Sequence, residues 1–226
     1  MGTFWILLLA LLPVAAVLYY VYRKDHDPEP RRTLGFAFLW GCLSVIPAVI
    51  FEWTFETTDP FIEMYLTVAL SEEVVKLAVL MLYIWKHADF NDSFDAIVYS
   101  VTVSLGFAAI ENILYVFQGG LTVAIARALL SIPGHATFAI LMGVFFSRAK
   151  HHFYYGRRLQ QYTHLALALL TATVAHGTYD YLAINSEDND AMVLALLAFV
   201  IILDVICLII IHKEANNDRP MVSSKF

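Results

Sequence analysis

Charged residues are scarce in this sequence: Asp, Glu, Lys and Arg make up 15% of 226 residues, and 60% are hydrophobic. A soluble domain carries about a quarter charged residues. The sequence has no basic stripe of the kind that binds nucleic acid, no Gly-rich phosphate loop and no low-complexity segment. Its two cysteines, Cys42 and Cys207, both lie in apolar stretches, which argues against a disulfide framework. These scarcities exclude a nucleic-acid-binding protein and indicate a membrane protein.

Long apolar stretches dominate what remains. A membrane-spanning α-helix needs about 20 mostly apolar residues. Strand-like alternation of the barrel type is absent, so helices are the only spanning structure available. We predict an all-α, polytopic transmembrane helix bundle of about seven spans, with residues 1–212 as a single transmembrane domain and residues 213–226 as a polar cytoplasmic tail. The predicted spans are 3–22, 34–53, 60–85, 94–117, 121–147, 162–184 and 191–212.

Basic residues fall on alternate connections. Of the 14 Lys and Arg residues, 12 lie between the first and second, third and fourth, or fifth and sixth spans, or in the tail. The connections 54–59, 118–120 and 185–190 contain neither Lys nor Arg. Because basic loops stay in the cytoplasm, we expect a multi-pass protein of the cell membrane, embedded in the lipid bilayer, with its N-terminus outside and its C-terminus in the cytoplasm.

Glu72 and Glu73 stand side by side in the middle of the apolar stretch 60–85. A carboxylate at the bilayer centre costs roughly 2.5–3.5 kcal/mol on insertion scales, and such residues mark functional sites by default. Lys76 follows at i+4 and i+3, so it can pair with either carboxylate. One alternative is an ion pair that only locks helices together, but that alternative needs one Glu rather than two.

Further ionisable and polar residues lie at matching depths in other predicted spans. His176 and Asp180 share a helix face, so the carboxylate can fix the tautomer of the imidazole; an interhelical hydrogen-bond pair is the alternative. His135 follows Pro133 and Gly134, which can open a helix where it lines a cavity, or simply kink it. We expect all of these groups to converge at mid to outer depth.

Two neighbours complete the candidate site. Glu111 precedes Asn112 in an apolar helix, and Arg127 lies beyond a short connection. Arg127 is either a counter-ion to Glu111 or a residue that extends to the membrane interface.

Water-mediated peptide hydrolysis fits these residue types best. A carboxylate in an apolar site can act as a general base toward water near neutral pH, and a histidine can stabilise an oxyanion or pass a proton to the leaving amine. No H-E-x-x-H zinc motif is present. The residues permit a Glu/His metal site, but their spacing does not require one.

At these residues the sequence resembles the PrsW family of bacterial intramembrane proteases, which make the first cleavage of an anti-sigma factor. The first predicted cytoplasmic loop, Lys24–Pro30, also looks like that of the family. The matching motifs are Ser71–Lys76 (SEEVVK), Val103–Tyr115 (VSLGFAAIENILY), Arg127–Leu130 (RALL), Gly134–Ala136 (GHA) and His176–Asp180 (HGTYD). The resemblance implies a single-span membrane protein as substrate, an anti-sigma factor above all.

The family is distantly similar to the CAAX-prenyl endopeptidase and bacteriocin-protection superfamily, with its Glu-Glu, Phe-x-x-x-His and His-x-x-x-Asn motifs. By that resemblance Glu72, or its neighbour Glu73, activates water and His176 assists at the oxyanion. Here Glu111 stands where the second motif has His, and Asp180 where the third has Asn. An ionised Asp cannot donate a hydrogen bond as Asn does. We favour metal-free hydrolysis, with a divalent metal such as zinc left open.

An ion- or proton-coupled transporter is the alternative, because chains of Glu, His and Asp also relay protons. Transporters commonly contain internal repeats and paired broken helices. We find no repeat, and only one Pro-Gly break, at 133–134. A structural or partner-binding membrane protein ranks third, because it gives no reason for two adjacent glutamates.

Overall fold

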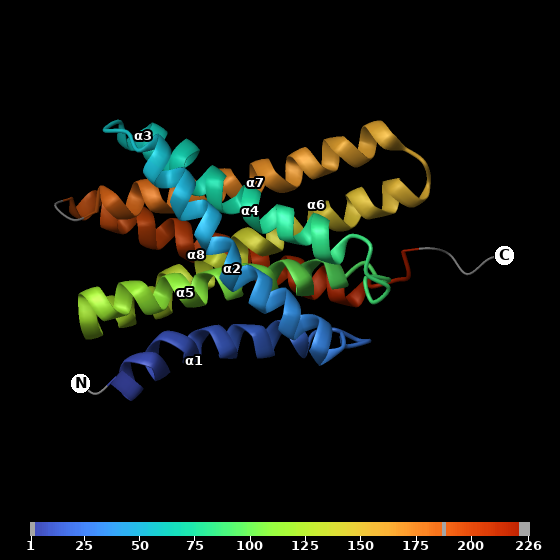
Figure 1. The fold of residues 1–226 in the computed structure, drawn as a ribbon, viewed down its shortest axis with the longest axis horizontal. Coiled ribbons are helices and arrows are strands. Elements are labelled where there is room, and N and C mark those ends of the chain that lie inside the picture. The colour runs from blue at the N-terminus through green and yellow to red at the C-terminus, as the bar shows by residue number, and fades with distance from the viewer. Residues whose placement is uncertain (1–2, 187–188, 222–226) are drawn as a thin grey trace.

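The computed structural model describes residues 3–186 and 189–221, and in these residues the chain is all-helical. Residues 187–188 of the predicted connection 185–190, and residues 222–226 of the predicted tail, lie outside the described residues. The α-helices are α1 (Thr3–Tyr22), α2 (Arg31–Phe55), α3 (Pro60–Ile62), α4 (Leu70–Val79), α5 (Asp95–Ala126), α6 (Ile132–Tyr154), α7 (Arg158–Ile184) and α8 (Asp190–Asn216). Figure 1 shows the long helices running back and forth between two ends of the molecule.

Each of the seven predicted apolar segments coincides with helix, but the number of spans is not confirmed. By length and composition, three helical stretches of the described chain can cross a membrane: Arg31–Phe55, Asp95–Tyr154 and Asp190–Asn216. The second of these is 60 residues long and contains Gly120, whose φ of 67° interrupts the helix in the predicted connection 118–120. Beyond Gly120 the chain leads back alongside α5 into α6. Helix α4, Leu70–Val79, is short because π-helical turns precede and follow it.

Three short π-helical segments interrupt the regular helices: η1 (Glu63–Ala69), η2 (Leu80–Ile84) and η3 (Arg127–Ser131). Two of them flank α4, which carries Glu72 and Glu73. The third ends at Ser131, two residues before Pro133, where the sequence predicts that the helix opens locally or kinks. Wide turns of this kind are rare and occur frequently at functional sites. Here they set the direction in which the polar side chains of α4 and α6 point.

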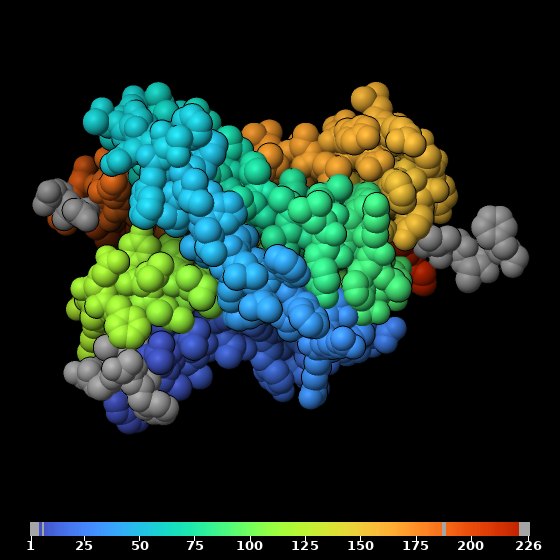
Figure 2. Space-filling view, viewed as in Figure 1, coloured from blue at the N-terminus to red at the C-terminus, as the bar shows by residue number. Residues whose placement is uncertain are grey.

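Glycines allow α2 and α5 to cross at very short range. A Cβ atom on Gly41 would lie 2.1 Å from the carbonyl oxygen of Val103, and one on Gly106 would lie 2.2 Å from that of Phe38. Small residues at such crossings are typical of helix packing in membranes. Figure 2 shows α2 lying diagonally across one face of the molecule. The crossing fixes α5, and Glu111 with it, against the rest of the bundle.

A similar close approach brings α7 to η1. A Cβ atom on Gly177 would lie 2.6 Å from the ring of Tyr65, and the hydroxyl of Tyr65 lies 2.9 Å from that of Thr178. Since Gly177 follows His176 directly, this contact places the histidine near the helix that carries the two glutamates. The bundle also buries α6 deeply, with Phe138, Met142 and Phe146 in its core.

The connections that carry the basic residues lie together at one end of the molecule (Figure 1), and the loop 86–94 packs against residues 218–221. Asp218 accepts hydrogen bonds from the Ser93 hydroxyl and the Phe94 N–H, at 3.0 and 2.8 Å. Helix α8 continues to Asn216, so the predicted start of a polar tail at residue 213 lies inside a helix, and residues 217–221 are packed rather than extended.

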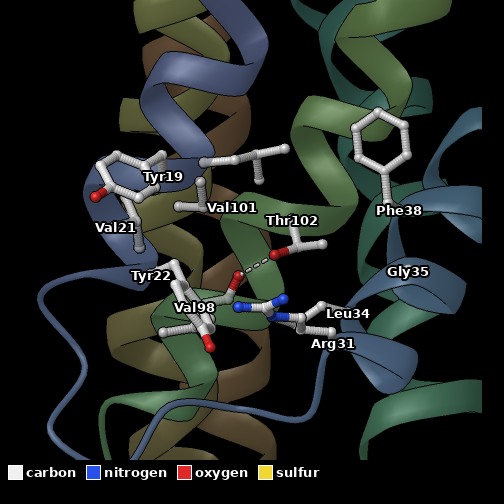
Figure 3. A pocket seen from close by; sticks show the side chains of 11 residues that line it. Tyr19, Val21, Tyr22, Arg31, Leu34, Gly35, Phe38, Val98, Val101 and Thr102 are labelled. Carbon is white, nitrogen blue, oxygen red and sulfur yellow. Dashed lines mark hydrogen bonds between the residues drawn. The ribbon is translucent and has the colours of Figure 1, made fainter.

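An apolar groove lies between α1, α2 and the start of α5, with a volume of about 520 Å³. Figure 3 shows Tyr19, Phe38 and Val101 around it, with the guanidinium of Arg31 turned toward Val98 and Thr102. The groove contains none of the predicted site residues, which lie in a second cavity described below.

We expect the α2–α5 crossing to tolerate no side chain. Gly106→Ala should lower the thermal unfolding midpoint of the detergent-purified protein, because its Cβ would overlap the Phe38 carbonyl oxygen. Overpacking of this kind costs typically about 1–3 kcal/mol. Gly35→Ala is the matched control: it lies in α2 with no atom within 4 Å of its Cβ, so it should be neutral or slightly stabilising. An equal loss for both variants would contradict the close crossing.

Candidate functional site

Lys76 lies between the two adjacent glutamates of α4. Its ammonium nitrogen is 2.9 Å from Glu72 Oε2 and 2.8 Å from Glu73 Oε1, and all three side chains are buried. The ammonium also lies over the ring of Phe107, 4.3 Å from the centroid. One cation between two carboxylates leaves the group with a net negative charge. The sequence expectation that Lys76 can reach either carboxylate is confirmed, and in fact it contacts both.

His176 of α7 faces both glutamates. Its Nδ1 lies 2.9 Å from Glu73 Oε1, where an N–H can donate to the carboxylate. Its Nε2 lies 3.9 Å from Glu72 Oε2 and 3.3 Å from Asp180 Oδ2. A carboxylate on one ring nitrogen fixes the tautomer and leaves the other available. Glu73 therefore takes the orienting role that the spacing alone had suggested for Asp180.

A second network joins α5 to α6. Glu111 Oε2 lies 2.8 Å from His135 Nε2, and Glu111 Oε1 lies 2.9 Å from the Arg127 guanidinium. Arg127 Nε in turn donates to the side-chain oxygen of Asn112 at 2.9 Å. The counter-ion expectation for Arg127 is confirmed. Ser104 fixes the backbone of α6 here, because its hydroxyl donates to the carbonyl of His135 at 2.9 Å.

The two networks meet through their histidines. The rings of His135 and His176 have their centroids 5.2 Å apart, and Phe138 stacks on His176 at 4.8 Å. Both histidines are 3% exposed. Groups from four parts of the chain, α4, α5, α6 and α7, are thus brought to one place, as expected from their predicted depths.

A cavity of about 520 Å³ opens onto this cluster. Glu72, Glu111, Arg127, His135, His176 and Asp180 all line it, together with apolar residues and two tyrosines, Tyr115 and Tyr179. Glu73 does not line it, and at 1% exposure it lies behind Glu72. The adjacent glutamates therefore differ: Glu72 faces the space where a reactant can enter, whereas Glu73 holds Lys76 and His176.

Glu52 of α2 was missed as a site residue. Sequence position placed it at the outer end of the second span, yet it lines the cavity and accepts a hydrogen bond from the Ser71 hydroxyl at 3.4 Å. Val45, Val49 and Glu52 follow one another along a single helix face, and all three line the cavity. That spacing is the signal that could have identified it.

Three of the residues can act together as metal ligands. One ligand atom each of Glu72, His135 and His176 lie within 4.8 Å of one another. Two histidines and one carboxylate form a common ligand set of catalytic zinc. Each histidine has a carboxylate on one ring nitrogen, as metal-bound histidines usually do. The other nitrogen of His135, Nδ1, is buried without a hydrogen-bond partner, so the residues fit a metal ion.

Asp204 does not join the site. It lines a different, apolar pocket between α1, α6 and α8, beside Cys207. A role limited to locking helices together also fails to describe the cluster, because such a role needs no cavity lined by carboxylates and imidazoles. What the arrangement can do is hold water or an ion between carboxylates and imidazoles on the cavity wall.

Comparison with known proteins agrees with this geometry. Residues 29–206 match the model of a family described as PrsW family intramembrane metalloprotease. Proteins named Protease PrsW are similar over most of their length. The one from Oceanobacillus iheyensis is 35% identical over 94% of this chain and 97% of its own. The one from Geobacillus kaustophilus is 38% identical over 77% of this chain and 78% of its own. The one from Bacillus subtilis is 33% identical over 79% of this chain and 83% of its own.

No solved structure matches the chain. The family match covers every residue of the cavity cluster, from Glu52 to Asp180. A protease also accounts for the paired glutamates beside the cavity, and the sequence contains no internal repeat of the kind common in transporters. The chain therefore belongs to the PrsW family of intramembrane metalloproteases.

Proposed function

We propose that the protein is an endopeptidase that hydrolyses a peptide bond of a single-span membrane protein in the cavity beside Glu72. The observation that carries the proposal is the pairing of Glu72, on the cavity wall, with two imidazoles that carboxylates hold in fixed orientations. A wet, polar cavity inside a helix bundle allows water to reach a peptide bond at membrane depth.

Glu72, His135 and His176 are the residues that would hold a divalent metal such as zinc. When bound, such an ion lowers the pKa of a water molecule and polarises a carbonyl group. This assignment departs from the metal-free hydrolysis favoured by the sequence. It is supported by the proximity of the three ligand atoms and by the buried, unpartnered Nδ1 of His135. Without a metal, Glu72 would itself be the base toward water.

The remaining residues position these three. Glu73 orients His176, and Glu111 orients His135 while Arg127 balances its charge. Asp180 lines the cavity with Oδ2 3.3 Å from His176 Nε2, so it can hold a proton destined for the leaving amine. Lys76 contacts Glu72 directly, with its ammonium nitrogen 2.9 Å from Oε2.

The substrate side of the proposal rests on the arrangement of charges and loops. The basic connections lie at one end of the molecule, and the loops without Lys or Arg at the other. Basic loops favour the cytoplasm, so the second end would face outward, with the N-terminus outside. Met64, Ala183 and Ile184 line the cavity close to that end. The resemblance to PrsW proteins points to an anti-sigma factor, cut first here and then by a second protease.

Glu72→Gln should abolish cleavage of a co-expressed single-span substrate while the protein still inserts in the membrane. The amide keeps the shape but loses the charge, and removing an acid–base group lowers rates by about 100-fold or more. His176→Ala should behave alike. Product is measured by immunoblot of the tagged substrate.

His152→Ala is the control for this series, since His152 lies at the basic end of α6, outside the cavity. It should cleave at the rate of the unmodified protein. Full activity in Glu72→Gln together with loss in Glu73→Gln would mean that the roles of the two glutamates are exchanged.

Metal removal provides a separate test. Treatment of the purified protein with a strong chelator should stop cleavage, and added Zn²⁺ should restore it. His135→Ala should lower the bound metal measured by mass spectrometry from about one ion per chain toward none. Unchanged cleavage in the metal-depleted protein would instead assign the water-activating role to Glu72 directly.

The position of the cut tests the proposed route of entry. A transmembrane helix has its carbonyls bonded internally, so cleavage should fall in a non-helical stretch just outside it or in its outer turn. Mass spectrometry of the two products locates the bond. A cut on the cytoplasmic side of the substrate's span would contradict both the orientation and the entry from the outer end.

A further inference from the structure

A second cluster of carboxylates lies far from the cavity, at the basic end of the molecule. Asp25 and Glu29 belong to the connection between α1 and α2, and Asp95 is the first residue of α5. All three are buried, at 6%, 4% and 1% exposure. One carboxylate oxygen of each lies within 4.8 Å of the others. The proposed peptidase chemistry uses none of them.

These carboxylates have no basic partner. Among the described residues, no Lys, Arg or His forms an ion pair with any of the three. Arg31, the nearest basic residue after Glu29, turns its guanidinium into the apolar groove of Figure 3. Instead, further acidic residues surround the cluster: Asp89 lies near Glu29, and Asp218 near Asp25. Buried charges of one sign require compensation.

The hydrogen bonds of the cluster leave one carboxylate oxygen, Asp25 Oδ2, without a donor. Asp95 Oδ2 accepts from the backbone N–H groups of Asn91 and Asp92, at 2.9 and 2.7 Å, and Glu29 accepts from the hydroxyl of Tyr99. Asp25 Oδ1 accepts from the Asp27 N–H at 3.1 Å. Asp25 Oδ2, however, is buried without a hydrogen-bond partner. This orphaned oxygen belongs to a side chain that is more than nine-tenths buried and lies within the cluster.

We propose that Asp25, Glu29 and Asp95 bind a hard divalent cation, Ca²⁺ or Mg²⁺, that ties the first cytoplasmic loop to the start of α5. Both ions prefer oxygen ligands, and the cluster offers no nitrogen or sulfur. Two oxygens bound to one Ca²⁺ at 2.3–2.6 Å are at most about 5 Å apart, which the observed spacing satisfies. Water would fill the remaining coordination positions.

Protonation is the competing explanation. Burial raises the pKa of Glu29 to about 7, with Asp25 and Asp89 adding to the shift against the hydrogen bonds from Tyr99 and Asp95. Burial likewise raises the pKa of Asp25 to about 6, since the hydrogen bond from the Asp27 N–H only partly offsets it. Two ionised carboxylates cannot hydrogen-bond each other, so the contact between Glu29 and Asp95 needs either a proton or a cation. A proton shared by Glu29 and Asp95 would leave Asp25 Oδ2 without a partner, whereas a cation would contact all three carboxylates.

Terbium luminescence can detect this site in the full-length protein in detergent. Tb³⁺ occupies Ca²⁺ sites, and a nearby aromatic ring sensitises its emission; Tyr99 is in direct contact with Glu29. We expect saturable emission at about one ion per chain, displaced by Ca²⁺ or by Mg²⁺, whichever the site prefers. Tyr99→Phe should weaken the emission while leaving binding of radioactive Ca²⁺ in place.

Variants assign the ligands. Asp25→Asn and Glu29→Gln should each weaken Tb³⁺ binding at least about tenfold, the lower end of the range for residues that support a metal site. Asp27→Asn is the matched control, because Asp27 is an exposed acid of the same loop. It should bind as the unmodified protein does. The double variant Glu72→Gln, His176→Ala should also bind normally, so failure of the peptidase proposal would leave this result unaffected.

Thermal unfolding separates a cation from a proton. The cation should raise the unfolding midpoint of the unmodified protein and of Asp27→Asn, but not that of Asp25→Asn. The absence of saturable Tb³⁺ binding would overturn the proposal. An equal loss of Tb³⁺ affinity in Asp25→Asn and Asp27→Asn would overturn it as well. If the unfolding midpoint does not change with added Ca²⁺ or Mg²⁺ but rises as the pH is lowered through 7, protons occupy the cluster instead.

Discussion

The buried ammonium of Lys76 is the contact on which the rest of the site depends. Removing one partner of a buried ion pair costs about 3–5 kcal/mol, because the other charge is left uncompensated. Here a single cation compensates two carboxylates on one helical turn, at 2.8 and 2.9 Å. With Lys76 in place, one glutamate can point into the cavity and the other can point at His176. Lys76 thus compensates the charge of Glu72, which faces the cavity, and that of Glu73, which orients His176.

The backbone is shaped to make that arrangement reachable. Gly177 lets α7 approach η1 closely enough for His176 to contact Glu73, and Gly41 and Gly106 let α2 press on α5. Hydrophobic burial does not drive helices together in lipid, so close packing and interhelical hydrogen bonds must. The polar cluster and the small-residue crossings therefore contribute jointly: the crossings set the distances, and the buried pairs discriminate against other registers.

Contacts within one helix were predictable from the sequence, whereas contacts between helices mostly were not. The i+3 and i+4 spacing of Lys76 to its glutamates, and that of Asp180 to His176, follows from helix geometry alone. Shared depth indicated that Glu111, His135 and His176 would meet. It did not reveal that Glu73 would orient His176, or that Glu52 would reach the cavity, because both depend on the rotation of one helix against another.

The acidic cluster at the opposite end escaped prediction for the same reason. Asp25, Glu29 and Asp95 are ordinary loop and helix-start residues in the sequence, and only the packed loop buries them. The count of seven spans also remains a prediction. Apolar length identifies helical segments well, but it does not reveal the π-helical segments that divide 60–84, or that helix resumes directly on both sides of the break at Gly120.

The π-helical segment η1 has a consequence for how this family can vary in length. It spends seven residues, Glu63–Ala69, on turns wider than those of an α-helix, directly before α4. Wound as a regular α-helix, the same seven residues would rotate every following side chain by about 100°, the angle of one α-helical residue. Glu72 would then turn away from the cavity although no residue of the cluster had been replaced. The wide winding between Asp59, which caps α3, and Glu72 is thus as much a part of the site geometry as the charged groups themselves, and a relative one residue shorter here would reach the same geometry with regular turns.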